Sequence, residues 1–170
     1  MDSTQRVRSG RDRTRFQIER NLGFGFDLDH TLLVDNHLER LAFLRLLETL
    51  TAGGGSPSGD APQEERAIDD LLARQRAGAF TIEEAVRRFA AGRGVVATPA
   101  IVDGYKACAL DMAQEFVRAV PGATSTLRAL RERGVAVAAL TNGWSPLQER
   151  KAACIGFEGP VLVSSILGVQ

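Results

Sequence analysis

The sequence has few cysteines, no net charge and no long apolar run, and each of these absences excludes a class of protein. Its two cysteines, Cys108 and Cys154, show no CxxC or Cys/His spacing, so we expect buried, reduced thiols. The 21 basic and 21 acidic residues cancel, which argues against nucleic acid as a partner. No apolar stretch is long enough to span a bilayer and no signal-peptide pattern opens the chain, so we expect no membrane partner and a cytoplasmic location.

What is present is the composition of a globular domain with a sizeable core. The chain has 170 residues, of which 44% are hydrophobic, and this length suits one domain that carries an insertion. Residues 1–20 differ from the rest, because they hold six arginines, three acids and few apolar side chains. We expect these residues to form a flexible, solvated tail.

The first half of the chain predicts one strand followed by a block of helices. Glycines alternate with bulky apolar residues in "LGFGFDLD", a short strand that stops at an acidic cluster. Asn36 then opens a helix, with Glu39 at the position that completes a capping box. Three further helices, the middle one capped by Thr81, are predicted without an intervening strand over residues 63–77, 81–91 and 98–119.

The second half predicts two more strands, each preceded by a helix. A helix over residues 121–134 leads to the continuous apolar strand "VAVAAL", which ends in "TNG". Ser145 and Gln148 form the capping box of the next helix, and "VLVSS" is the third short strand.

This order of elements predicts an α/β fold with a parallel sheet of about three strands. Residues 21–34 and 120–170 would form the α/β core. Residues 35–119 would form a helical domain inserted after the first strand, because a connection of that length is too long for a simple loop.

Polar side chains gather where two of the predicted strands end. Asp27, Asp29 and Thr31 lie at the end of the first strand, and Thr141 and Asn142 end the second. In an open α/β sheet the carboxyl ends of the strands form the ligand crevice, so we expect these groups to face one pocket. Two carboxylates so close together repel each other unless a cation sits between them, and oxygen ligands suit Mg²⁺.

This set of groups suits chemistry on a phosphate. Beside a metal ion one carboxylate can act as a nucleophile, and the other can give and take a proton. Thr141 and Asn142 supply neutral hydrogen-bond donors that can hold a phosphate. Acids after a strand are also common as loop residues and helix caps, so the Asp-x-Asp motif alone is not specific.

The same residues resemble a known family. "FDLDHTLL" is similar to the first motif of the haloacid dehalogenase (HAD) superfamily, and "VAVAALTNG" is similar to the second; the resemblance covers about residues 22–170. It implies a HAD-like Rossmannoid core with a helical cap, of the phosphoglycolate-phosphatase-like and nucleotidase-like branch. It also implies a Mg²⁺-dependent phosphatase that acts on a small phosphorylated metabolite, such as a sugar phosphate, phosphoglycolate or a nucleotide.

The resemblance assigns a role to each matching residue. Asp27 would be the nucleophile that forms an aspartyl-phosphate, and Asp29 would be the general acid and base. Asp27 would also bind the metal ion, and Asp29 would lend its backbone carbonyl to it. Thr141, Asn142 and Gly143 would bind the phosphate.

The chain departs from the family pattern in three ways. His30 stands where a glycine is common. The family's third motif, a lysine, and its fourth motif, one or two later acids, are both missing before the chain stops at Gln170. We therefore interpret the sequence as the truncated front part of a phosphatase with an incomplete site, and we expect its first strand to lie at an uncovered apolar edge. Lys151 lies inside a predicted helix and is expected to be solvent-exposed, not a substitute for the missing lysine.

Other functions and substrate contacts stay open at this point. A catalytically silent module that binds a phosphorylated metabolite is the main alternative, and a phosphomutase or haloacid dehalogenase is a minor one. Trp144 is a candidate to stack on a base or sugar, with packing in the core as an equal alternative. Tyr105 and Lys106 are candidate substrate contacts, although on helices such residues mostly face solvent.

Overall fold

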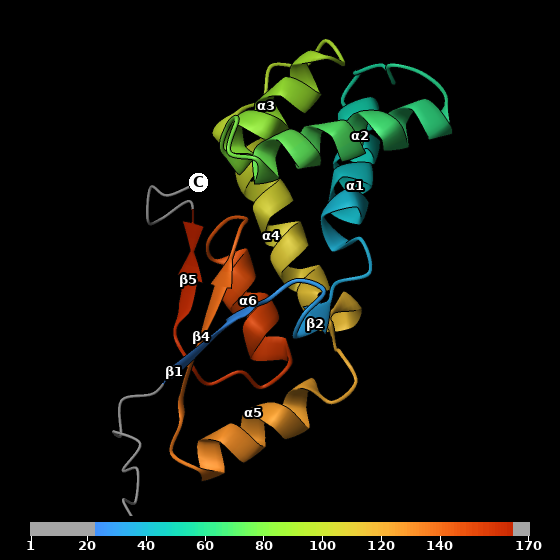
Figure 1. Ribbon diagram of the computed structural model, residues 1–170. Coiled ribbons are helices and arrows are strands. Elements are labelled where there is room, and N and C mark those ends of the chain that lie inside the picture. The colour runs from blue at the N-terminus through green and yellow to red at the C-terminus, as the bar shows by residue number, and fades with distance from the viewer. Residues whose placement is uncertain (1–22, 165–170) are drawn as a thin grey trace, which may run out of the picture.

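The computed structural model describes residues 23–164, so the predicted tail at residues 1–20 lies outside the described part of the chain. In chain order, the strands and helices are β1 (Gly23–Asp27), β2 (Leu33–Val34), α1 (Leu38–Ala52), α2 (Ala61–Arg76), α3 (Ile82–Ala91), α4 (Pro99–Phe116), β3 (Arg118–Ala119), α5 (Ala123–Glu132), β4 (Ala136–Thr141), α6 (Leu147–Cys154) and β5 (Val161–Val163). Figure 1 shows helices α1–α4, which we call the helical block, at one end of the molecule and the sheet with α5 and α6 at the other. Within residues 23–164 no helix is both long and apolar enough to cross a membrane.

The sheet confirms the predicted α/β class. Its three strands are parallel and lie in the order β1-β4-β5. The register places Asp27 beside Leu140, so Thr141 lies one residue beyond the level of Asp27 along the neighbouring strand. As predicted, β1 lies at an edge, since it pairs with β4 alone within the described residues.

Within residues 23–164, helices pack against one face of this sheet. Helix α5 packs against β4 and helix α6 against β5, and they cover the face that carries the buried residues Ala139, Thr141 and Val163. The alternate residues, among them Leu140 and Leu162, point to the opposite face and are 49% and 38% exposed. The glycines of β1 lie on that face too, and a Cβ at Gly25 would collide with the Leu140 side chain, so glycine lets that side chain lie across the strand.

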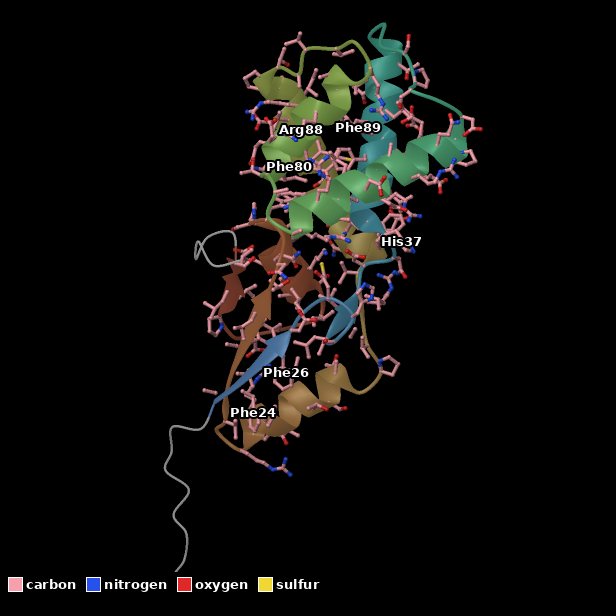
Figure 2. The ribbon with its side chains drawn as sticks, turned by 45° about the horizontal axis from the view of Figure 1, so that its top comes forward. Phe24, Phe26, His37, Phe80, Arg88 and Phe89 are labelled. Carbon is pink, nitrogen blue, oxygen red and sulfur yellow. The ribbon has the colours of Figure 1, made fainter. Side chains whose placement is uncertain are left out.

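The helical block has an aromatic interior of its own. The ring of Phe43 lies 5.0 Å from that of Phe89 and 4.5 Å from that of Tyr105, and all three side chains are buried. The expectation that Tyr105 faces solvent is therefore wrong. Figure 2 shows Phe80, Arg88 and Phe89 together in the block, where the Arg88 guanidinium stacks 4.5 Å from the centre of the Phe80 ring.

A short antiparallel pair, which the sequence did not indicate, joins the two ends of the helical block. Leu33 pairs with Ala119 and Val34 with Arg118, so the chain leaves the sheet and returns to it through neighbouring strands. The helix predicted to reach residue 119 ends at Phe116 for this reason. Strands of two residues are too short to leave a periodic pattern in a sequence.

The predicted helix starts were right for α3 but wrong for α1 and α6. Thr81 caps α3 by accepting a hydrogen bond from the Glu84 N–H at 3.3 Å. Helix α1 instead begins after His37, which adopts a left-handed conformation, and the Asn36 side chain donates a 2.7 Å hydrogen bond to the Phe116 carbonyl. The Ser145 hydroxyl, expected to cap α6, donates to the Glu149 carboxylate at 2.6 Å.

The two cysteines are free thiols, and each is partly exposed, whereas burial was predicted.

Candidate active site

Asp27 and Asp29 lie at the carboxyl end of β1. The residue between them, Leu28, is fully buried, and the alternation of an extended chain therefore turns both carboxylates away from the core. The Thr31 hydroxyl donates a 3.0 Å hydrogen bond to Asp27 Oδ2, which fixes one oxygen of that carboxylate. His30 adopts a left-handed φ of 62°, and this turn explains physically why a glycine suits the position.

Thr141, Asn142 and Gly143 form the turn that follows β4. Thr141 is buried, and its hydroxyl donates to the Asn142 carbonyl at 3.1 Å. Gly143 has a φ of 132°, and a Cβ there would collide with the buried side chain of Gln148. The turn therefore needs glycine, which brings its backbone close to helix α6.

One cavity of about 650 Å³ brings these two strand ends together. Asp27, Asp29, Thr141 and Asn142 line it, as predicted from the strand ends, whereas Gly143 lines a neighbouring cavity. The helical block supplies the facing wall, which includes Arg40 from α1 and Asp69 and Arg76 from α2. In total four aspartates and two arginines line the cavity, which leaves an excess of negative charge.

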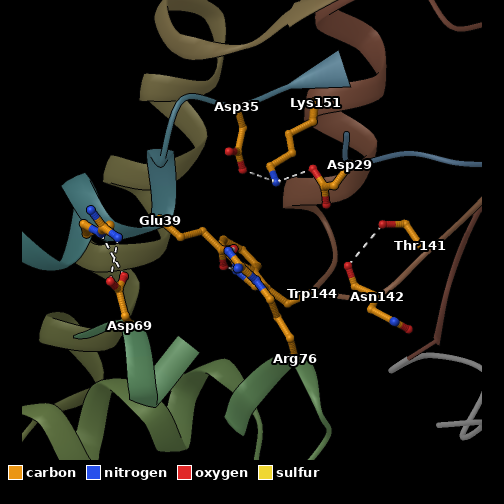
Figure 3. Close-up of polar contacts among 10 residues, drawn as sticks. Asp29, Asp35, Glu39, Asp69, Arg76, Thr141, Asn142, Trp144 and Lys151 are labelled. Carbon is orange, nitrogen blue, oxygen red and sulfur yellow. Dashed lines mark hydrogen bonds and ion pairs between the residues drawn. The ribbon is translucent and has the colours of Figure 1, made fainter. Parts of the chain in front are cut away.

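Lys151 is a site residue that the sequence argument placed wrongly. It is only 1% exposed, and its Nζ lies 3.0 Å from Asp29 Oδ1 and 2.7 Å from Asp35 Oδ2 (Figure 3). A signal for this burial was present, because Lys151 lies four residues after Leu147 and four before Ile155, on the buried face of α6. The prediction that Lys151 lies inside a helix was correct, but the prediction that it faces solvent was wrong.

The ion pairs of Lys151 change its pKa and that of Asp35. Burial alone would lower the pKa of Lys151, but attraction to Asp29 and then to Asp35 outweighs it, so the pKa is raised. Burial likewise acts to raise the pKa of Asp35, and the charge and hydrogen bond of Lys151 outweigh it, so that pKa is lowered. Both partners are therefore charged near neutral pH.

A second buried group, Glu39, links the helical block to the turn after β4. Glu39 is 2% exposed; its Oε1 accepts a 3.0 Å hydrogen bond from Trp144 Nε1 and its Oε2 one of 2.9 Å from Arg76 Nη2. Trp144 is buried as well, so packing in the core is its role, and its ring does not form an open stacking platform. Lys106 pairs with Glu83 at 2.7 Å, and its Nζ lies 5.6 Å from the centre of the Trp144 ring.

The residues at the strand ends suit a hard cation that needs few protein ligands. Within residues 23–164 no group of three or more His, Cys, Asp or Glu residues is arranged to hold a metal ion. Mg²⁺ is commonly held by one or two carboxylates and takes its other oxygens from water and substrate phosphate. The Asp27 carboxylate matches that donor set, the Asp29 backbone carbonyl would add a second oxygen, and the excess negative charge of the cavity favours a divalent cation.

The comparisons with known proteins agree with this fold. A family model described as haloacid dehalogenase-like hydrolase matches residues 24–167. The HAD-hydrolase YfnB of Bacillus subtilis, crystallised with magnesium, has 21% identity and a TM-score of 0.56, with 89% of this chain and 67% of that chain covered. A hydrolase from Pseudomonas syringae has 15% identity and a TM-score of 0.52, with coverage of 85% and 62%.

A predicted phosphoglycolate phosphatase from Haemophilus somnus has 19% identity and a TM-score of 0.51, with 86% of this chain and 64% of that chain covered. The chain thus spans about two thirds of the length of these structures. No curated protein matches the sequence. Since the family model covers most of the sequence and the fold agrees, the chain belongs to the haloacid dehalogenase-like hydrolases.

Proposed function

We propose that this hydrolase is a Mg²⁺-dependent phosphatase that acts on a small phosphorylated metabolite. The observation that carries the proposal is the shared cavity, in which Asp27 and Asp29 at the end of β1 meet Thr141 and Asn142 at the end of β4. Carboxylates on one side and neutral hydrogen-bond donors on the other suit the transfer of a phosphoryl group.

In the proposed mechanism Asp27 is the nucleophile. The Thr31 hydroxyl holds Asp27 Oδ2, which leaves Oδ1 free to attack phosphorus. The new bond to Oδ1 forms as the ester P–O bond breaks, and Asp29 gives its proton to the departing oxygen. Asp29 then takes a proton from the water that hydrolyses the aspartyl-phosphate, which releases inorganic phosphate.

The other groups of the site would bind the phosphate and the metal ion that balances its negative charge. Thr141, Asn142 and the backbone of Gly143 would donate hydrogen bonds to the phosphoryl oxygens. Asp27 through its carboxylate and Asp29 through its backbone carbonyl would hold Mg²⁺, which when bound would supply positive charge to the phosphate and to the Asp27 carboxylate. Lys151 contacts Asp29 at Oδ1, which leaves Oδ2 for the proton.

We also propose that the helical block is a cap that selects the substrate. It contributes Arg40, Asp69 and Arg76 to the wall opposite the strand ends, and the β2–β3 pair joins it to the sheet at residues 33–34 and 118–119. A domain in this position can exclude water from the reacting phosphate.

The test is phosphate release by the 170-residue chain with and without Mg²⁺, on 2-phosphoglycolate, glucose 6-phosphate and a nucleoside monophosphate. Asp27→Asn should lower the rate by about 10³-fold or more, because the amide is a poor nucleophile. Asp103→Asn, on the exposed face of α4, is the matched control and should leave the rate unchanged. An unchanged rate in Asp27→Asn would rule out the proposed mechanism.

A second candidate function is a binding module without turnover. Two observations favour it. Lys151 forms an ion pair with Asp29, and within residues 23–164 no third carboxylate joins Asp27 and Asp29 in a group that could hold a metal ion. This candidate predicts that the chain binds a phosphorylated metabolite in a titration, while no phosphate is released in the presence of Mg²⁺.

A further inference from the structure

The two arginines of the cavity differ in how many of their N–H donors remain available to a ligand. Arg40 is occupied by Asp69, which accepts from its Nε at 2.8 Å and from its Nη2 at 2.5 Å. A third nitrogen, Nη1, lies 3.9 Å from Glu65. Both partners lie on α2, so these contacts tie α1 to α2 and leave Arg40 little to offer a ligand.

Arg76 is held at a single point. Its Nη2 donates to Glu39 Oε2 at 2.9 Å, and within the described residues no other side chain accepts a hydrogen bond from it. The side chain is 52% exposed although it lines the cavity, so Nε and Nη1 remain open to a ligand. Arg76 is the last residue of α2 and lies in the wall of the cavity that faces the strand ends.

The contact that holds Arg76 is rigid. Glu39 is buried and has both carboxylate oxygens occupied, one by Arg76 and the other by Trp144 (Figure 3). Trp144 directly follows the turn of residues 141–143, so the position of the guanidinium is fixed relative to the turn proposed to bind phosphate. A guanidinium held in this way has already lost the side-chain entropy that binding would otherwise cost.

We propose that Arg76 binds a second anionic group, so that the substrate is a phosphate ester whose leaving group carries a carboxylate or another phosphate. This inference rests on the proposed function, because it assumes that the first phosphate lies at Asp27 and Thr141. The free edge of a guanidinium matches the planar oxygens of a carboxylate or phosphate. A neutral sugar or nucleoside would leave these free donors without a charged acceptor.

The experiment compares ligands that cannot be hydrolysed. 3-Phosphonopropionate and propylphosphonate differ only in their terminal carboxylate and methyl group, and their affinities for the chain are measured by titration calorimetry with Mg²⁺. We expect 3-phosphonopropionate to bind about ten-fold more tightly, the size of one charge-assisted hydrogen bond. Ethane-1,2-bisphosphonate, in which a second phosphonate replaces the carboxylate, is the third ligand and shows which of the two anions is preferred at this position.

The variants test whether Arg76 causes this preference. Arg76→Gln should abolish the ratio between the two ligands, whereas Arg66→Gln, an exposed arginine of the same helix that does not line the cavity, is the matched control and should change it less than about two-fold. Arg76→Lys keeps a positive charge for Glu39, so the fold is retained, but it lacks the forked donors and should also lose the preference. A merely structural role would weaken both ligands equally and leave the ratio unchanged.

The outcomes separate this inference from the proposed function. Equal affinities in the unsubstituted chain, no binding of either ligand, or a ratio that survives in Arg76→Gln would each overturn the inference. If the chain prefers 3-phosphonopropionate but releases no phosphate from any ester, the anion site stands and the phosphatase proposal fails. If it hydrolyses anionic and neutral esters equally well, the phosphatase stands and the inference fails.

Discussion

The helical block buries its large apolar side chains more completely than the sheet does. In the helical block the Phe43 ring packs against the rings of Phe89 and Tyr105, and each of the three is at most 3% exposed. In the sheet one face is buried under α5 and α6, while Leu140 and Leu162 remain well exposed on the other face. The contribution of a side chain to stability therefore depends more on its part of the molecule, and on its face of the sheet, than on its type.

The largest effect is expected in the middle of the helical block. Phe43→Ala removes a fully buried ring that contacts both Phe89 and Tyr105, so it should lower the free energy of unfolding by about 3–5 kcal/mol. Urea unfolding followed by circular dichroism measures the change. Phe24→Ala is the control, because that ring is 45% exposed at the edge of the sheet and should cost clearly less. Equal losses of stability in the two variants would contradict this difference in burial between the helical block and the sheet.

The second largest loss of stability is expected when the buried charge of Lys151 is removed. Lys151→Met keeps the length of the side chain but leaves Asp29 and Asp35 close together without their cation, so we expect a loss of about 2–4 kcal/mol. Lys106→Met is the matched control, since its more exposed pair with Glu83 should contribute less than about 1 kcal/mol. If the two variants unfold at the same urea concentration, the Lys151 pairs contribute no more than a surface ion pair.

The pH dependence of stability follows from the same contacts. The pKa of Asp35 lies below its ordinary 3.8, so its stabilising contribution is present above pH 3.8 and is lost as the pH falls through the folded-state value. The pKa of Lys151 lies above its ordinary 10.5, so its contribution is complete below pH 10.5 and is lost as the pH rises through the higher folded-state value. In urea unfolding across pH, Lys151→Met should lose less stability than the unsubstituted chain at both extremes. Parallel profiles would contradict this.

The smallest effect is expected on the open face of the sheet. Leu140→Thr should change stability by about 0.5 kcal/mol or less, because the side chain is already half exposed and threonine suits a strand. Val163→Thr, on the packed face and 1% exposed, places a hydroxyl in the core and should cost about 1–3 kcal/mol. Thermal unfolding of the two variants measures both. A large loss for Leu140→Thr would show that its face is covered in solution.

Local patterns predicted the order of the elements well but predicted their contacts poorly. The Asp-x-Asp motif, the apolar strand before "TNG" and the Thr81 cap depend on neighbouring residues, and each lies where the sequence placed it. Asn36 and Ser145 looked like helix caps by the same local rule, but each side chain found another partner once the chain had folded. Capping rules fail where a tertiary hydrogen bond competes for the same side chain.

The sequence by itself determined the α/β class, the strand ends that carry Asp27 and Thr141, and the position of the helices between them, because periodicity and spacing are properties of the chain alone. Only the tertiary structure decided which charges meet. Lys151 reaches Asp29 and Asp35 across more than a hundred residues, and Trp144 reaches Glu39 over a similar separation. The burial of these groups, and with it the pKa values of Lys151 and Asp35 and the free edge of Arg76, depends on how helices distant in sequence pack together, and no local pattern encodes that packing.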